Sequence, residues 1–361
     1  MLDFTSALYL GLRHPSNSLR PWASLSTGVP AALKAPPGET KVAKSIAALL
    51  GQEQALLAPS TLHLVWDLFG VLSAGRFAIL IDDGTYPISR WGAERAAARG
   101  VPIRDFAHHD ISQVSAAVTW AISMRRRPFL VTDGFCPGCG RAAPLPTYLE
   151  LLGPARGELF IDDTQALGIL GSKPSYSNTY GVGGRGTLAW HGVEHREAIV
   201  VCSLAKGFGA PIACLAGPER WVSGFARASK TRVHTSPPSA AAIAAAERAL
   251  DLNAVVGERR RERLRQLVRR FRRRVVALGL RPNRSQFPVQ SFVHGSGLDP
   301  AEAHSALQRR GIKTVLHRSH KTLRPAMSFL ITAGHSEDDI DQATVALAES
   351  ANIIVRTGSG L

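Results

Sequence analysis

The stretch ELFIDDTQALGILG, residues 158–171, joins a short apolar run to two acids and a loop of small residues. A continuous apolar run of this length, bounded by polar and glycine-bearing segments, is typical of a strand buried on both faces. Such strands form parallel sheets with helices on both sides, and ligands bind beyond the carboxyl ends of their strands. The position of Asp162 and Asp163 therefore indicates a functional site at that edge of a sheet.

Similar apolar runs stand at intervals on both sides of this stretch. We predict buried strands at residues 76–82, 127–134, 158–163, 198–204 and 212–217, with helices between them at 89–100 and 111–127. Continuous apolar strands that alternate with helices predict an α/β fold with a mostly parallel central sheet.

The pattern changes after residue 250. Long helical patterns follow, with apolar runs only at 287–295 and 326–334, which predicts a smaller C-terminal α+β domain. We therefore expect an N-terminal entry segment over 1–40, a large α/β domain over 41–250 and a small α+β domain over 251–361.

The composition limits the classes of protein that the chain could represent. Its 361 residues, 45% of them hydrophobic, suffice for a full core, and no apolar run is long enough to predict a membrane span. The N-terminal residues lack the basic, apolar and small-residue succession of a signal peptide. We therefore expect a cytoplasmic protein without a membrane partner.

The formal net charge of +15 raises the question of an anionic partner. Much of the positive charge lies in residues 257–280, where apolar residues recur at helical spacing and arginines fill the other faces. This pattern is typical of an amphipathic surface helix with a solvated basic side. No zinc-finger spacing or RNP-like aromatic pattern accompanies it, so we expect no nucleic-acid partner. A phosphorylated cofactor or a CoA thioester is another reason for basic surface.

Four cysteines are too few for a disulfide framework in a chain of this length. Cys136 and Cys139 have C-x-x-C spacing, but no second pair with matching spacing completes a zinc site. We interpret the two as small residues in a tight Pro-Gly turn, and we expect no metal.

A lysine follows another of the predicted strands. Lys206 comes directly after the apolar run at 198–204, where partial desolvation would lower its pKa and make the amine a nucleophile for Schiff-base chemistry. The alternative is an exposed loop lysine. Asp162 at a neighbouring strand end favours the chemical role, because a buried carboxylate keeps the ring nitrogen of pyridoxal phosphate protonated.

Other strand and helix ends supply polar groups for such a cofactor. Ser60 and Thr61 open a helix after a strand-like run, where amide N–H groups and hydroxyls suit a phosphate. Ser203 adds a hydroxyl near Lys206, and Asp133 ends the predicted strand at 127–134. The residues alone therefore predict a pyridoxal-phosphate site at the carboxyl edge of the sheet.

Motifs along nearly the whole chain resemble those of the α-oxoamine synthase family of fold-type I pyridoxal-phosphate enzymes. They are, in chain order, DFTSALYLGLRHP, VTDGFCPGCGRAAPLPTYLELL, FIDDTQALGILG, SLAKGFG, HTSPPSAAA and LITAGHSEDDID. The resemblance implies an aspartate aminotransferase-like fold, in which Lys206 forms the internal aldimine and Asp162 holds the pyridinium nitrogen. The implied phosphate contacts are Ser60, Thr61, the Leu62 amide and Ser203, with Thr235 and Ser236 reaching across from the partner subunit of a homodimer.

The chain departs from the family at four positions of this implied site, one of which is Pro137 in place of a serine. Tyr86 stands where the family has the histidine that stacks on the cofactor ring, and a phenol can stack there as well. Gln165 replaces the histidine that contacts the cofactor's phenolic oxygen, and its amide does not titrate. Ser328 occupies the place of an arginine that clamps the substrate carboxylate. Arg318 and Arg324 are candidates to replace that guanidinium; the alternative is that both are surface charges.

Three functions remain open from the sequence. We favour a C-acyltransferase, in which the external aldimine of an amino acid gives a carbanion that attacks an acyl thioester of CoA or of a carrier protein. The second is an aminotransferase, with Lys206 moving a proton between the amino acid and the cofactor. The third is a non-catalytic protein on the same fold, which the joint presence of Lys206 and Asp162 disfavours.

Overall fold

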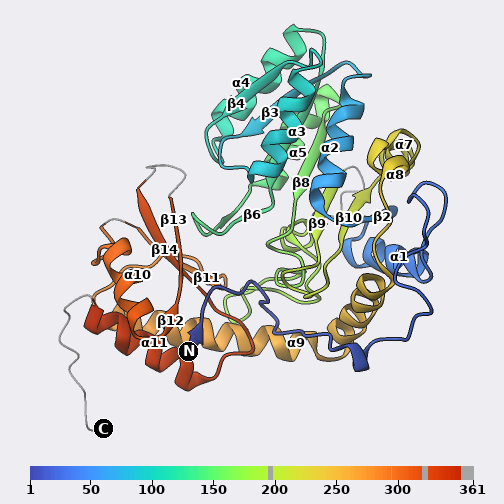
Figure 1. Ribbon diagram of the computed structural model, residues 1–361. Coiled ribbons are helices and arrows are strands. Elements are labelled where there is room, and N and C mark those ends of the chain that lie inside the picture. The colour runs from blue at the N-terminus through green and yellow to red at the C-terminus, as the bar shows by residue number, and fades with distance from the viewer. Residues whose placement is uncertain (194–197, 294, 319–323, 351–361) are drawn as a thin grey trace. The chain divides into compact units, whose positions relative to one another are not determined.

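The computed structural model describes residues 1–193, 198–293, 295–318 and 324–350 (Figure 1). The chain divides into two compact units. The larger unit comprises residues 12–136 and 142–257, and the smaller unit comprises residues 1–11, 137–141 and the described part of 258–361. Helix α9 (Ala240–Ala277) contributes residues to both units. None of the helices in the described ranges is long and apolar enough to cross a membrane.

The larger unit is built on a seven-stranded sheet with the strand order β2-β10-β9-β8-β5-β3-β4 (Figure 1). Neighbours from β9 to β4 are parallel, whereas β10 is antiparallel to both β9 and β2. The predicted α/β fold with a mostly parallel sheet is thus confirmed, and all five predicted strands form. The strands are β2 (Gln54–Ala58), β3 (Phe77–Asp82), β4 (Ile103–Phe106), β5 (Arg127–Asp133), β8 (Glu158–Asp162), β9 (Ala198–Ser203) and β10 (Ala213–Gly217).

Helices connect these strands and cover the sheet. The predicted helices at 89–100 and 111–127 correspond to α3 and α4. The helices of the larger unit are α1 (Glu39–Leu50), α2 (Thr61–Leu72), α3 (Pro87–Ala97), α4 (Ile111–Ser123), α5 (Leu145–Leu152), α6 (Thr187–Trp190), α7 (Glu219–Ala228) and α8 (Lys230–His234), with single 3-10 turns η1 (Ser16–Ser18) and η2 (Gly153–Ala155). Two short strands, β6 (Phe135–Cys136) and β7 (Arg141–Ala142), pair with each other.

One hydrophobic core lies between the sheet and helices α2, α3 and α7. Ile79 and Ile81 of β3 belong to it, while Leu80 between them is fully buried on the opposite face of the strand. Phe69 of α2 meets Phe129 and Phe160 edge to face, at centroid distances of 5.8 Å and 5.4 Å. Burial on both faces explains why the strands read as continuous apolar runs.

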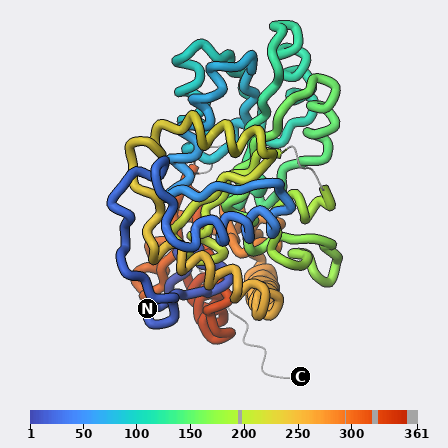
Figure 2. The backbone as a smooth tube through the Cα atoms, turned by 90° about the vertical axis from the view of Figure 1, so that its right-hand side faces the viewer, coloured from blue at the N-terminus to red at the C-terminus, as the bar shows by residue number. Residues whose placement is uncertain are grey.

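The smaller unit is an α+β arrangement, as the sequence predicts for the C-terminal part. Its antiparallel sheet has the order β11-β14-β13. The N-terminal strand β1 pairs in parallel with β12, so the start of the chain lies beside its C-terminal third (Figure 2). The elements are β1 (Leu2–Asp3), β11 (Val289–Phe292), α10 (Pro300–Arg309), β12 (Ile312–Lys313), β13 (Val315–Arg318), β14 (Pro325–Leu330) and α11 (Glu337–Ser350).

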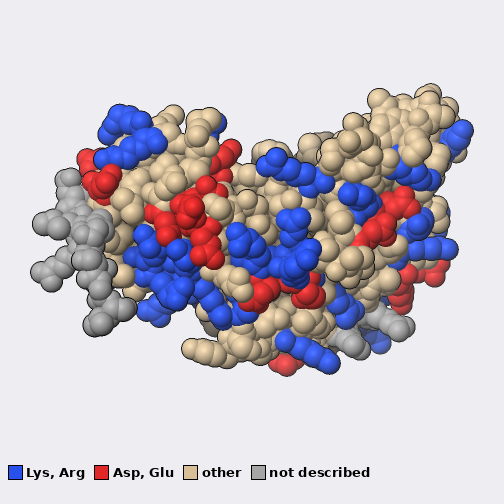
Figure 3. Space-filling view, turned by 90° about the horizontal axis from the view of Figure 1, so that it is seen from below, with Lys and Arg blue, Asp and Glu red and all other residues tan. Residues whose placement is uncertain are grey.

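The arginine-rich segment 257–280 is helical as far as Ala277, as its spacing predicts, and forms the C-terminal half of α9. Its arginines bind acids and carbonyl groups of the same unit. Arg270 contacts Asp341 and Glu337 at 2.7 Å, and Arg274 donates to Thr344. Figure 3 shows one face of the molecule, on which many of the Lys and Arg side chains lie next to Asp and Glu side chains. Part of the high positive charge therefore holds α9 against α11.

Candidate active site

Four strands of the larger unit bring their carboxyl ends to one edge of the sheet. Asp133 at the end of β5 is paired in register with Asp162 at the end of β8. Ser203 at the end of β9 is paired with Ala213 of β10, and Ala213 is paired with Ala58 at the end of β2. Parallel strands thus deliver the polar residues that the sequence singles out to the same edge.

Lys206 lies in the turn that follows β9. Its side chain is partly buried, and this burial lowers the pKa of the amine, while the nearby carboxylates of Asp162 and Asp133 act in the opposite direction. The turn packs closely on its neighbours, because a Cβ at Gly207 would lie 2.4 Å from the carbonyl oxygen of Leu167. A half-desolvated amine next to two acids can act as a nucleophile or as a proton acceptor.

Asp162 is buried, and its Oδ1 accepts a hydrogen bond of 3.0 Å from the backbone N–H of Thr164. Burial raises the pKa of this carboxyl group, while the hydrogen bonds from Thr164 and the charge of Lys206 lower it. Thr164 also accepts the backbone N–H of Ser203 through its Oγ1 at 3.0 Å, which ties the ends of β8 and β9 together. Thr164 was not predicted from the sequence, although an aspartate at the end of a strand often accepts the backbone N–H two residues later in an Asx turn.

Tyr86 and Asp133 form a second contact at this edge. The backbone N–H of Tyr86 lies 3.2 Å from both carboxylate oxygens of Asp133. The ring centroid of Tyr86 lies 5.8 Å from the Nζ of Lys206, at the outer range of a cation–π contact. Burial, and then the charge of Asp162, raise the pKa of Asp133 well above its ordinary value. Two neighbouring acids and one amine therefore share the site and influence one another's protonation.

Helix α2 begins beside this edge. Ser60 is its N-cap, and the Ser60 side chain makes no capping hydrogen bond within the described chain; its Oγ lies 2.8 Å from His63 Nδ1 instead. Thr61 and Leu62 occupy the first turn, whose N–H groups have no acceptor inside a helix. These amides and the two hydroxyls suit an anion such as a phosphate.

The remaining predicted residues lie in several places. Ser203 Oγ accepts the N–H of Ala205 at 3.2 Å, and Gln165 is half-buried in the loop after Asp163. Thr235 ends α8 with its Oγ1 bound to the Thr231 carbonyl group at 2.8 Å, and Ser236 is exposed. A contact of Thr235 and Ser236 with a partner subunit stays a prediction.

Arg318 and Arg324 belong to the smaller unit, and both are exposed. Ser328, at the position of the implied arginine, is buried in β14. Its Oγ lies 2.8 Å from Ser291 Oγ and 2.8 Å from His317 Nε2. The hydroxyl of Ser328 is therefore part of a buried hydrogen-bond network across the three-stranded sheet. A substrate role for either arginine stays a prediction.

The donor set at the carboxyl edge fits pyridoxal phosphate. The buried carboxylate of Asp162 matches a protonated ring nitrogen, and Lys206 supplies the amine beside it. The uncapped N-terminus of α2 matches the phosphate. Tyr86 offers an aromatic face within reach of Lys206.

Known proteins share this sequence pattern. Residues 25–347 match the family model described as aminotransferase class I and II. The chain is 32% identical to an 8-amino-7-oxononanoate synthase of Methylococcus capsulatus over 257 residues, which make up 70% of this chain and 62% of that relative. It thus spans about three fifths of the length of the first curated relatives that it matches.

Solved structures share the fold. A serine palmitoyltransferase from S. paucimobilis with a bound PLP–myriocin aldimine matches with a TM-score of 0.83 and 15% identity, over 98% of this chain and 88% of that chain. An 8-amino-7-oxononanoate synthase from Francisella tularensis matches with a TM-score of 0.73 and 17% identity, over 97% and 98%. These structures confirm the predicted fold-type I architecture. The curated relatives confirm the resemblance to α-oxoamine synthases. Because the family model matches most of this chain, the chain belongs to the aminotransferase class I and II family.

Proposed function

We propose that the protein is a pyridoxal-phosphate-dependent C-acyltransferase of the α-oxoamine synthase type, which joins an amino acid to an acyl thioester. The observation that carries the proposal is the partly buried amine of Lys206 next to the buried carboxylate of Asp162, at the carboxyl edge of the sheet. The names of the curated relatives support the acyl-transfer reaction. Bound pyridoxal phosphate supplies the electron sink that stabilises negative charge at the α-carbon of the amino acid.

The side chains at the carboxyl edge of the sheet have separate roles in this reaction. Asp162 would hold a proton on the ring nitrogen as a carboxylate, a form that the hydrogen bonds from Thr164 and the charge of Lys206 favour against its burial. Burial favours the neutral amine of Lys206, which can then accept the α-proton of the amino acid. Tyr86 would stack on the cofactor ring, and the first turn of α2 would bind its phosphate.

The substrates are an amino acid and an acyl thioester, either of CoA or of a carrier protein. Because a buried serine at position 328 stands where the family has a clamping arginine, we expect weaker selection of ordinary α-amino carboxylates. Arg318 or Arg324 would supply the missing guanidinium.

An aminotransferase is the second candidate, and the family model favours it by covering enzymes of that type. The same lysine and acid would serve. Lys206 would then move a proton from the α-carbon of the amino acid to a carbon atom of the cofactor. A homodimer with shared sites and a cytoplasmic location are further predictions of this assignment.

Two measurements on the purified chain test the assignment. The first is cofactor binding: added pyridoxal phosphate should produce an absorbance band, and borohydride should fix the cofactor to Lys206, located by peptide mass spectrometry. Lys206→Ala is the matched control. A parent chain that gains no band and no fixed cofactor would contradict the proposal.

The second measurement identifies the reaction. Release of thiol from an acyl-CoA that depends on an added amino acid supports acyl transfer. Conversion of the bound cofactor to its amine form, reversed by a keto acid, supports the aminotransferase instead. A screen of amino acids by cofactor absorbance then narrows the first substrate.

A further inference from the structure

A buried aspartate at the end of β3 joins two loops that are far apart in the sequence. Asp82 is 1% exposed, and its Oδ1 accepts the backbone N–H of Gly84 at 2.8 Å. The same oxygen accepts the Nδ1–H of His108 at 2.7 Å, and Oδ2 accepts the backbone N–H of His109 at 3.3 Å. One carboxylate therefore holds the turn after β3 and the loop after β4 together.

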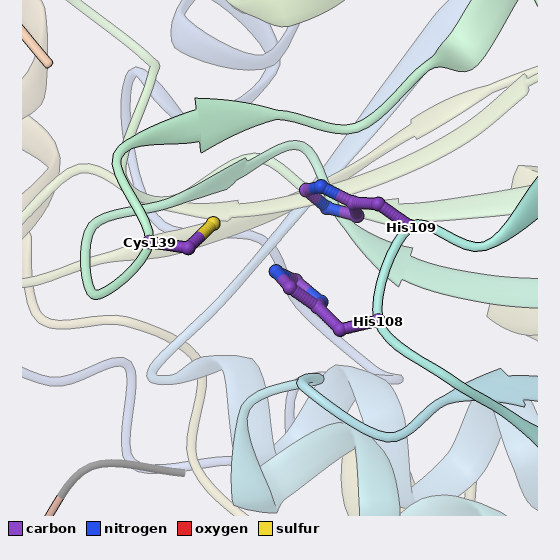
Figure 4. Close-up of side chains that lie close together, drawn as sticks. All are labelled: His108, His109 and Cys139. Atoms are coloured by element: carbon purple, nitrogen blue, oxygen red, sulfur yellow. The ribbon is translucent and has the colours of Figure 1, made fainter. Parts of the chain in front are cut away.

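The two histidines that follow β4 present a stacked pair of imidazoles to this carboxylate. Their ring centroids are 3.7 Å apart, and Figure 4 shows His108 and His109 one beside the other. Cys139, also labelled in that view, belongs to the smaller unit. Burial alone would raise the pKa of Asp82, but the hydrogen bond and charge of His108, the backbone hydrogen bond from Gly84 and the charge of His109 together lower it. The aspartate is thus an ionised acceptor, and bonds to it are charge-assisted.

The turn after β3 is shaped to receive the His108 ring. A Cβ at Gly84 would lie 2.3 Å from His108 Nδ1, so only glycine lets the imidazole pack directly on the turn. The backbone N–H of Asp83 also donates to the Phe106 carbonyl group at 3.0 Å. The end of β4 and the loop after it therefore support this turn, through the Phe106 backbone and the His108 side chain.

The turn ends at Tyr86, which reaches the candidate active site. Its N–H binds Asp133, and its ring lies near Lys206. Because Tyr86 is 52% exposed, side-chain packing restrains it weakly, and the backbone of the turn must set its place. His108 thus acts on Tyr86 through Asp82 and the intervening backbone.

We propose that His108 is a positioning residue, which holds the turn 82–86 through Asp82 so that Tyr86 covers the cofactor beside Lys206. The part that concerns the cofactor rests on the proposed function. The part that concerns the turn rests only on the contacts within the larger unit.

The test compares two replacements of His108. His108→Leu removes the donor at similar volume, whereas His108→Asn keeps an amide nitrogen close to the place of Nδ1. We expect about tenfold weaker binding of pyridoxal phosphate in His108→Leu, and recovery to within about threefold of the parent in His108→Asn. His304→Leu is the matched control, because His304 also uses Nδ1 in a hydrogen bond, to Thr314 Oγ1 at 2.8 Å, but lies in the smaller unit.

Hydrogen exchange of the cofactor-free chain gives a second readout. Peptides that contain residues 83–88 should exchange about tenfold faster in His108→Leu, with the parent rate restored in His108→Asn. Parent-like exchange together with parent-like cofactor binding in His108→Leu would overturn the proposal. If the parent itself binds no pyridoxal phosphate, the proposed function fails, while exchange still decides the role of His108 in the turn.

A variant that leaves His108 in place tests the same contact in case His108→Leu does not fold. Gly84→Ala keeps the imidazole and displaces it from the turn, so it should reproduce the faster exchange at residues 83–88. If His108→Leu does not fold, the result for Gly84→Ala decides the matter. Parent-like exchange in Gly84→Ala would refute the inference.

Discussion

The Nζ of Lys206 lies 5.8 Å from the centre of the Tyr86 ring, although the two residues follow different strands of the sheet. The same tyrosine donates its backbone N–H to Asp133, whose neighbour in register is Asp162. Lys206, Tyr86 and the two acids therefore form one connected site. Each of its members can be tested separately.

Tyr86 is expected to act through its ring. Tyr86→Phe keeps the stacking surface and should bind pyridoxal phosphate nearly as the parent does. Tyr86→Ala loses that surface and should bind it about five- to tenfold more weakly, as expected for the loss of one aromatic contact. Titration of the cofactor-free chain, followed by absorbance, checks this. Equal affinities of the Ala and Phe variants would show that the ring makes no contact with the cofactor.

Asp162→Asn should keep some cofactor but lose most turnover, by about a hundredfold or more, because a neutral amide does not hold the proton on the ring nitrogen. Turnover is measured as amino-acid-dependent thiol release. Asp251→Asn, an exposed acid on α9, is the control. Turnover of Asp162→Asn equal to that of the parent would mean that another group holds the ring nitrogen.

Asp163 should make stability depend on pH. Burial raises its pKa from 3.8 to about 7, despite two hydrogen bonds from Thr187. Because the pKa of Asp163 is higher in the folded chain than in the unfolded chain, the protonated carboxyl group stabilises the fold. This contribution is fully present below about pH 4 and is lost as the pH rises through about 7. The free energy of unfolding should therefore fall between about pH 4 and 7 in the parent. In Asp163→Asn, urea unfolding should show a fall that is smaller by a few kcal/mol, on the order of the pKa shift. The same pH dependence in both chains would contradict this.

Glu158 is expected to support the fold rather than the site. It is 2% exposed at the start of β8 and accepts Trp221 Nε1–H at 3.0 Å and Arg220 Nη2 at 3.2 Å. Glu158→Ala should lower the free energy of unfolding by about 2–4 kcal/mol, because it leaves the buried indole N–H unsatisfied. Glu158→Gln retains an acceptor and should cost less. Denaturant unfolding measures both, and equal losses would argue against the hydrogen bond to Trp221.

The candidate carboxylate ligands Arg318 and Arg324 are tested by amino-acid binding. If one of them replaces the family arginine, its change to Ala should weaken binding of the amino acid by about tenfold or more, with cofactor affinity unchanged. Arg260→Ala, on α9, is the control. Tight, carboxylate-dependent binding that survives both changes would refute the replacement.

Much of this protein can be predicted from local sequence. Strands buried on both faces appear as continuous apolar runs, so the five runs located β3, β5, β8, β9 and β10, and the residues after them located Asp162 and Lys206. The signal is strong because both burial and strand ends are properties of neighbouring residues. The strand β4 is only four residues long and has two adjacent charged residues, Arg104 and Asp105, at its centre, so it gave no such signal and was missed.

Contacts between distant residues could not be predicted from the sequence. The pairing of Asp82 with His108, the bridge from Thr164 to Ser203 and the buried network of Ser328, Ser291 and His317 each join segments whose separation along the chain says nothing about contact. Such contacts depend on strand order and register, which arise when the whole sheet assembles. The kind of sheet and the chemistry at its edge follow from local burial and residue type, so both can be predicted from the sequence. How those groups are held in place depends on contacts that form only when the chain folds.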